Sequence, residues 1–315
     1  IGKLYTHKMR QSEQRYISRF TDFGFKRIFG TALNKDLLIN FLNSLFGKEQ
    51  VVKDVKYLNS ENVGDVYTDR KAIFDVYCEN EQGEKFIVEM QNAFQKHFKD
   101  RSLYYSTFPI KEQAPKGADW DFKLAHVYVV ALLNFDMQDE AFDQKAISHD
   151  VGLLDKKTKK VFNDKLTFKY VEIAKFNKPL DKLRTVYDKW LYALKNLSRL
   201  NDRPKELRDK VFDRLFEEAE IAKFSKIELK EYEDSLKAYR DIKNSLDTAM
   251  EQGFEKGREE GREVGRAEGR AEGITSQRID TARSMLEDGL PLDKIIRYTG
   301  LTDEEIKNLT SGNRN

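Results

Sequence analysis

The sequence has little cysteine, little histidine and no long apolar run. Its single cysteine, Cys78, cannot form an internal disulfide, and its place in an apolar stretch indicates a small buried side chain. The longest apolar run, residues 127–135, is far shorter than the ~20 residues that a membrane-spanning helix needs. No secretory signal opens the sequence, so we expect a cytoplasmic protein in a reducing compartment, without membrane attachment.

An excess of either charge is also missing. The 56 Lys and Arg residues nearly cancel the 54 Asp and Glu residues, which leaves a net charge of +2. Any surface for nucleic acid must therefore be a local patch. The four histidines, His7, His97, His126 and His149, are scattered, so no Cys/His cluster suggests zinc. Residues that can fill a hydrophobic core are abundant, since 39% of residues are hydrophobic, including 21 Phe and 14 Tyr.

The first 180 residues combine helical and strand periodicities. Apolar residues at helical spacing over 22–46, with Gly30 and Gly47 as stops, predict two consecutive helices. Alternating patterns predict strands over 51–58, 71–79, 85–91, 124–135, 147–153 and 166–176. A helix is expected over 97–113, which Pro109 should kink or shorten. Strands interleaved with helices predict an α/β domain over residues 1–180, with the last two strands extending the sheet or forming an adjoining hairpin.

The remaining chain is predicted to be helical in three parts. Residues 181–250 form a module of about three helices, with one face built from Trp190, Leu191, Leu194 and Leu197. Residues 251–273 repeat glycine every four positions with arginine in step. Because each glycine costs about 1 kcal/mol in a helix interior, we expect a connecting segment that is mobile or only marginally helical when alone. Residues 274–315 predict a small helical tail whose last helix opens with Thr302 and Glu305.

The glycine repeat and the tail favour association between copies of the chain. A glycine every four residues leaves a stripe without side chains, where another helix could approach closely, and the tail has an apolar face to bury. We therefore expect a homo-oligomer formed through the C-terminal region. The alternative is a solvated spacer followed by an autonomous helical domain.

The segment 71–91 predicts a hairpin with one apolar face. A three-residue loop, 81–83, would place Gly83 at the left-handed position that such loops require. Counting from this loop pairs Phe74 with Met90, Val76 with Val88, Cys78 with Phe86, and Asp75 with Glu89. All the apolar partners then share one face, and both carboxylates lie on the other.

Two opposed carboxylates on a sheet face repel each other unless a cation lies between them. Oxygen ligands alone favour Mg²⁺ or Mn²⁺, and Gln91 on the same face could orient a water or a phosphate oxygen beside the metal. Such a set suits phosphodiester hydrolysis. The alternative is a solvated strand face with two polar positions, but Ile73, Tyr77 and Ile87 flank the acids and indicate a covered face. Spacing alone leaves both interpretations open.

At these residues the sequence resembles the PD-(D/E)XK nuclease superfamily, in particular its transposase-like branch with the Rpn recombination-promoting nucleases. The resemblance covers nearly the whole chain. It is carried by residues 21–30 (TDFGFKRIFG), 74–76 (FDV), 87–91 (IVEMQ), 101–105 (RSLYY), 170–176 (YVEIAKF) and the glycine-arginine-glutamate repeat.

The resemblance implies a restriction-endonuclease-like fold, a mixed central sheet flanked by helices, with a C-terminal helical region. It also implies a magnesium-dependent DNA endonuclease associated with recombination or mobile elements, in which Asp75 and Glu89 bind the metal. Gln91 departs from the superfamily pattern, which has Lys there. Because Gln carries no positive charge, catalysis must depend more on the metal and on neighbouring cations, for which Lys26, Arg70, Lys71 and Arg101 are candidates.

Two further positions have two interpretations each. Arg101 and Tyr105 share a face of the predicted helix and either hold a phosphate and brace the site, or simply pack there. Asp22 is either the acid that the superfamily often contributes from its first helix or an N-cap, and the pattern favours the cap.

Three functions fit the sequence. The first is the DNA endonuclease. The second is a nuclease-fold DNA-binding or assembly protein without activity, since Gln91 removes an expected charge. The third is an RNA-processing nuclease. No aromatic-rich RNA motif and no base-reading helix is recognisable, so the target sequence cannot be read.

Overall fold

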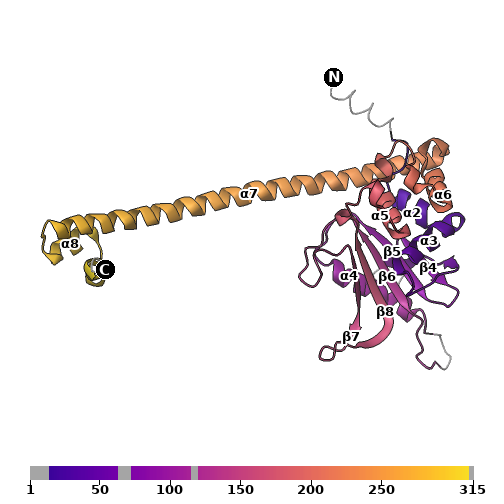
Figure 1. Ribbon diagram of the computed structural model, residues 1–315, viewed down its shortest axis with the longest axis horizontal. Coiled ribbons are helices and arrows are strands. Elements are labelled where there is room, and N and C mark those ends of the chain that lie inside the picture. Colours follow the sequence, from indigo (N-terminus) through magenta and orange to yellow (C-terminus); the bar gives the residue numbers. More distant parts are fainter. Residues whose placement is uncertain (1–13, 63–71, 115–119, 312–315) are drawn as a thin grey trace, which may run out of the picture. The chain divides into compact units, whose positions relative to one another are not determined.

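The computed structural model describes residues 14–62, 72–114 and 120–311, within two compact units, Ile1–Arg240 and Asp241–Asn315 (Figure 1). The first unit holds the sheet and the helices that pack on it. The predicted module that begins at residue 181 packs into the same core, because Trp190 and Phe212 are buried with residues of the sheet. The four-part division expected from the sequence stays a prediction.

A six-stranded mixed sheet forms the centre of the first unit, as expected. The parallel strands β5, β6 and β8 lie side by side, and the other strands pair antiparallel at the two edges. In spatial order the strands are β1 (Val55–Tyr57), β4 (Val76–Asn80), β5 (Lys85–Gln91), β6 (Val127–Leu133), β8 (Val161–Glu172) and β7 (Ser148–Leu154). A separate two-stranded sheet pairs β2 (Glu61–Asn62) with β3 (Ala72–Ile73).

Helices cover both faces of the sheet (Figure 1). On one face lies the larger apolar core, built with α2 (Asp22–Phe29), α3 (Lys35–Phe46), α5 (Val186–Asn196) and α6 (Lys210–Ala219). On the other face α4 (Phe98–Lys111) packs over Ile87, Val129 and Tyr170. The expected pair of helices over 22–46 and the helix around 97–113 are thus confirmed, and α4 ends two residues after Pro109. Short 3-10 turns are η2 (Ala32–Asn34), η3 (Ile173–Lys175), η4 (Leu180–Lys182), η5 (Leu197–Arg199), η6 (Lys205–Leu207) and η7 (Ile221–Lys223).

The predicted hairpin register is confirmed between β4 and β5. Val76 pairs with Val88 and Cys78 with Phe86, and Gly83 in the loop has φ +77°. Glycine adopts this left-handed backbone without the steric cost that a Cβ would add. The apolar partners Val76, Cys78, Phe86 and Val88 all face the larger core, as the register requires.

The strand predicted over 71–79 is interrupted, because the chain bends between β3 and β4 and residues 72–73 pair in the separate two-stranded sheet. Phe74 and Asp75 lie in this break, outside both ladders. The Phe74 amide donates to Ser60 O instead of to β5, and the Phe74 ring packs against Tyr105 on the α4 face. The expected pairing of Phe74 with Met90 is therefore not formed.

The strand expected over 51–58 is shorter than predicted, because a side chain takes its hydrogen bonds. Asn43 of α3 accepts from Val52 N (2.7 Å) and donates to Val52 O (2.8 Å), so β1 begins only at Val55. The last two predicted strands both extend the sheet and form a hairpin, β7–β8.

The helix α7 (Lys226–Glu287) begins in the first unit and continues through the glycine repeat. The repeat is thus helical, and its low stability when isolated stays a prediction. In the second unit the end of α7, α8 (Leu292–Thr299) and α9 (Asp303–Ser311) bury Ala282, Ile295 and Ile306 together, and Thr302 and Glu305 form the expected capping box. Within the described ranges, no helix is both long enough and apolar enough to cross a membrane.

Candidate active site

Glu89 is a buried acid on the face of the sheet that α4 covers. It lies near the carboxyl end of β5 with 6% of its surface exposed. Burial and the nearby Asp75 carboxylate raise the pKa of Glu89 to about 8, although Arg101 and Gln91 oppose the change. A carboxyl group that is costly to ionise in the folded chain is typical of a site that binds a cation.

Asp75 lies in the break before β4. Its side chain accepts a backbone N–H of β5 that a carbonyl of the neighbouring strand would accept in a regular sheet. Its Oδ2 accepts from Met90 N at 2.8 Å, the residue after Glu89. Burial raises the pKa of Asp75, while the Met90 N–H bond lowers it. The two acids thus meet at one end of the hairpin, as expected, but through the bend rather than as a cross-strand pair.

Gln91 is held on both sides by hydrogen bonds. Its Nε2 donates to Glu89 Oε2 at 3.1 Å, and its Oε1 accepts from Arg101 Nη2 at 2.5 Å. Arg101 also donates from Nη1 to Gln95 at 2.5 Å. The Gln91 amide, which stands where the superfamily has Lys, is therefore fixed in orientation. The Arg101 guanidinium is hydrogen-bonded to its oxygen.

Tyr105 borders the same site from α4. The Arg101 guanidinium lies 5.7 Å from the Tyr105 ring centre, which confirms that the two side chains share a face. Burial raises the pKa of Tyr105, and the Glu89 carboxylate adds to this effect. Tyr105 packs on Phe74 and Arg101 bonds Gln91, and binding of a phosphate by this pair stays a prediction.

The acid pair fits a divalent cation. Asp75 Oδ1 and Glu89 Oε1 form no hydrogen bond with any described residue, so each acid keeps one oxygen free for a ligand. A cation between them would remove the repulsion that raises the pKa of Glu89, and an oxygen donor set suits Mg²⁺ or Mn²⁺. In the described ranges, no group of three or more Asp, Glu, His or Cys side chains is placed so that it could hold a metal ion, and the acid pair offers two carboxylates.

A cavity of about 600 Å³ reaches Asp75 from the side of α2. Asp22 and Lys26 of α2 line it and form an ion pair at 3.0 Å. The Asp22 carboxylate raises the pKa of Asp75 and the Lys26 ammonium lowers it, after the larger effects of burial and hydrogen bonding. The preferred N-cap role of Asp22 is wrong, because Thr21 Oγ1 accepts from Gly24 N and caps α2, which leaves the Asp22 side chain in the cavity.

Another wall of this cavity is formed by α7. No pattern in the sequence predicted that this helix lies beside the site. Glu228, Glu231 and Ser235 line it there. Their sequence distance from Asp75 left no local signal, since only the packing of α7 on α2 brings them close. Arg70 and Lys71, the other two candidate cations, lie outside the described residues.

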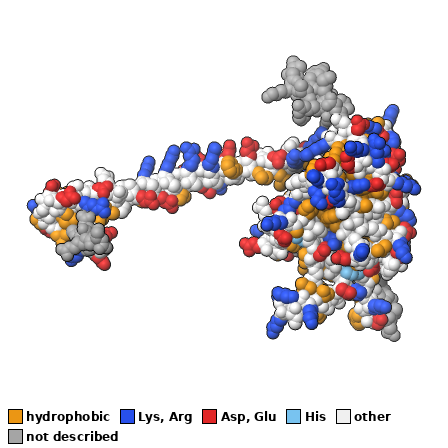
Figure 2. All heavy atoms as spheres, viewed as in Figure 1, with side chains coloured by type: hydrophobic (Ala, Val, Ile, Leu, Met, Phe, Trp, Pro, Cys, Tyr) orange, Lys and Arg blue, Asp and Glu red, His pale blue; other side chains and the backbone are white. Residues whose placement is uncertain are grey.

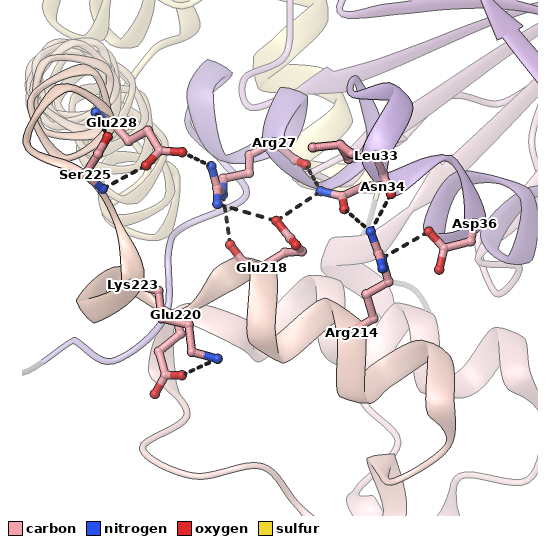
Figure 3. Close-up of polar contacts among 10 residues, drawn as sticks. All are labelled: Arg27, Leu33, Asn34, Asp36, Arg214, Glu218, Glu220, Lys223, Ser225 and Glu228. Atoms are coloured by element: carbon pink, nitrogen blue, oxygen red, sulfur yellow. Dashed lines mark hydrogen bonds and ion pairs between the residues drawn. The ribbon is translucent and has the colours of Figure 1, made fainter.

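Arg27 of α2 links α7 to α6 through hydrogen bonds (Figure 3). Its guanidinium donates to the Glu228 carboxylate of α7, and its Nε donates to Glu218 O of α6 at 3.0 Å. Asn34 joins the network by donating to Arg27 O at 2.8 Å, and Glu228 Oε2 accepts from Ser225 N at 2.8 Å. The start of α7 is thus tied to α2 and α6 by charge-assisted bonds.

A second buried acid, Glu172 at the end of β8, has a different character. It is fully buried, and its oxygens accept from Lys175 Nζ (3.0 Å) and Met137 N (2.7 Å) and contact His149 Nε2 (2.7 Å). Its hydrogen-bonding capacity is satisfied by the protein itself. Glu172 is therefore a structural group, in contrast to the acid pair.

A mixed six-stranded sheet with helices on both faces and a C-terminal helical region is a restriction-endonuclease-like fold. Residues 19–249 match the family described as PD-(D/E)XK nuclease family transposase. The chain belongs to this family.

The tail matches a separate domain. Residues 277–311 correspond to the Rpn/YhgA-like nuclease family, C-terminal HTH domain, which spans the end of α7, α8 and α9. No base-reading helix was recognisable in the sequence, so this helix-turn-helix was not predicted. No significant match was found among curated proteins or solved structures.

Proposed function

We propose that this protein is a divalent-metal-dependent DNA endonuclease that acts in recombination or in the movement of mobile elements. The observation that carries the proposal is the joint arrangement of Asp75, Glu89 and Gln91, each with a polar atom directed to one end of the β4–β5 hairpin. Membership in a nuclease family with a helix-turn-helix tail supports DNA as the substrate.

Each side chain has a distinct task in this proposal. Asp75 and Glu89 would hold Mg²⁺ or Mn²⁺, which when bound polarises the phosphoryl oxygen and makes a water more acidic. Gln91, held by Glu89 and Arg101, positions the attacking water or a phosphate oxygen. Arg101 and Lys26 supply the positive charge that Gln91 lacks, and both lower the pKa of Asp75.

The alternative is a DNA-binding or assembly protein that keeps the fold without activity. Gln91 favours it, because the amide cannot donate a proton or neutralise charge as Lys would. Its bonds to Glu89 and Arg101 favour the active enzyme, because a residue without a role needs no fixed orientation.

Cleavage of supercoiled plasmid by the purified full chain, with and without magnesium, tests the proposal. We expect Asp75→Ala and Glu89→Ala each to abolish nicking, and Gln91→Ala to reduce it less. Glu81→Gln, in the exposed loop of the same hairpin, is the matched control and should cleave normally. Equal cleavage by the parent and both alanine variants would show that the activity belongs elsewhere.

A further inference from the structure

The β7–β8 hairpin continues beyond the body of the sheet. Leu166 of β8 is the last residue that pairs with β6, opposite Val127, so residues 153–165 have only each other as strand partners. A register shift after Gly152 marks the point where the hairpin leaves the core. Its turn is ordered, because Asp155 Oδ1 accepts from Lys157 N (3.1 Å) and Thr158 N (2.6 Å).

This hairpin carries exposed apolar side chains on both faces. Phe162 is 80% exposed, Val161 65%, Leu154 52% and Leu153 43%. Leu154 and Val161 are cross-strand partners and share one face, whereas alternation places Phe162 on the other. Four exposed apolar side chains on so small a ribbon indicate a contact surface.

Positive charge surrounds these apolar residues. Lys156, Lys157, Lys159 and Lys160 at the turn are exposed, and none forms an ion pair with a described residue. The Asp155 carboxylate is occupied by the turn itself, and the hydrogen bond from Thr158 lowers its pKa. Figure 2 shows basic (Lys or Arg) and hydrophobic side chains together at the lower end of the first unit, where Figure 1 places the β7–β8 turn.

We propose that the β7–β8 hairpin is a DNA-binding arm, with its lysines on the phosphates of a duplex and Phe162 inserted in the adjoining groove. A two-stranded ribbon fits a DNA groove, and exposed apolar side chains act as wedges at base steps. Phosphates lining both sides of a groove complement a turn with four exposed lysines.

The arm lies away from the catalytic residues. Glu89 is level with Tyr170 of β8, and the strand continues nine positions from Tyr170 back to Val161, on the order of 30 Å at ~3.3 Å per residue. That distance corresponds to about nine base pairs. The arm would therefore hold the duplex roughly one helical turn from the site of cleavage. This inference rests on the proposed nuclease function only in taking DNA as the substrate.

Binding of a labelled 30-base-pair duplex to the full chain in EDTA, over a range of salt concentrations, tests the arm without requiring cleavage. The triple variant Lys156→Ala, Lys157→Ala, Lys160→Ala should bind about tenfold or more weakly near 0.15 M salt. The slope of log affinity against log salt should fall by about 2 to 3, at ~0.9 for each lost phosphate contact. Phe162→Ser should weaken binding and leave that slope unchanged, because it removes no ionic contact.

The matched control removes three exposed lysines elsewhere, Lys182→Ala, Lys205→Ala and Lys210→Ala, and should bind like the parent. The inference is overturned if the hairpin triple variant binds like this control, or if it loses adhesion to anionic vesicles and not to duplex. Unchanged unfolding, followed by fluorescence of the buried Trp190, shows that the substitutions act on the surface. Because binding is measured directly, a chain that never cuts DNA would disprove the proposed activity and leave this test intact.

Discussion

Replacing Glu89 by Gln should stabilise the folded protein at alkaline pH in the absence of metal. The pKa of Glu89 rises from 4.5 to about 8 on folding, so its ionisation opposes folding. Stability from this group is complete below pH 4.5 and is lost as pH rises through 8. At 1.36 kcal/mol for each pH unit, the loss has an upper limit of about 5 kcal/mol. The amide in the Glu89→Gln variant would remain neutral and keep a carbonyl oxygen as acceptor for Gln91.

Urea unfolding in EDTA at pH 5 and pH 9 measures this effect by tryptophan fluorescence, because Trp120 and the buried Trp190 both belong to the first unit. Glu89→Gln should gain about 2 to 5 kcal/mol over the parent at pH 9 and little at pH 5. Glu81→Gln, an exposed acid, should gain nothing at either pH. Equal stability of Glu89→Gln and the parent at both values would refute the buried-acid reasoning.

Magnesium should narrow the difference in stability between the two proteins. A cation that binds only the folded state stabilises by RT ln(1 + [L]/Kd), about 1.4 kcal/mol at tenfold excess over Kd. The parent should gain this stability and Glu89→Gln should gain much less, because one of two metal-binding carboxylates is gone. Since the metal requires the ionised acid, the effect of magnesium on the parent should grow as pH rises towards 8.

Three further predictions concern other parts of the chain. Arg19 is 1% exposed, and none of its guanidinium nitrogens has a hydrogen-bond partner among the residues that the structure describes, so Arg19→Met should raise the free energy of unfolding by about 1 kcal/mol or more, measured by urea titration. An added Cβ at Gly257, Gly261 or Gly265 would meet nothing within 4 Å, so each Gly→Ala change should raise helix stability by about 1 kcal/mol, visible as higher helical content on heating by circular dichroism. If the C-terminal region forms a homo-oligomer, light scattering should show a multimer for the full chain and a monomer for a chain ending at Met250, and two monomers would leave only the spacer interpretation.

Local rules were enough to determine the hairpin and most elements around it. Gly83 fixes the loop, and the loop fixes which residues of β4 and β5 pair, because a slip by one residue would turn the apolar face of each strand outward. The two helices over 22–46 follow equally from helical spacing and from glycines at their ends.

Only the tertiary structure decided how the site is assembled. The bend at Phe74 and Asp75 depends on a bond to Ser60 and on packing against α4, and neither is encoded in the alternation of the segment itself. Glu231 reaches the cavity because α7 packs on α2, across more than half of the chain. The sequence by itself determined which acids belong together, since a short loop relates them, whereas their surroundings come from long-range contacts that no local pattern records.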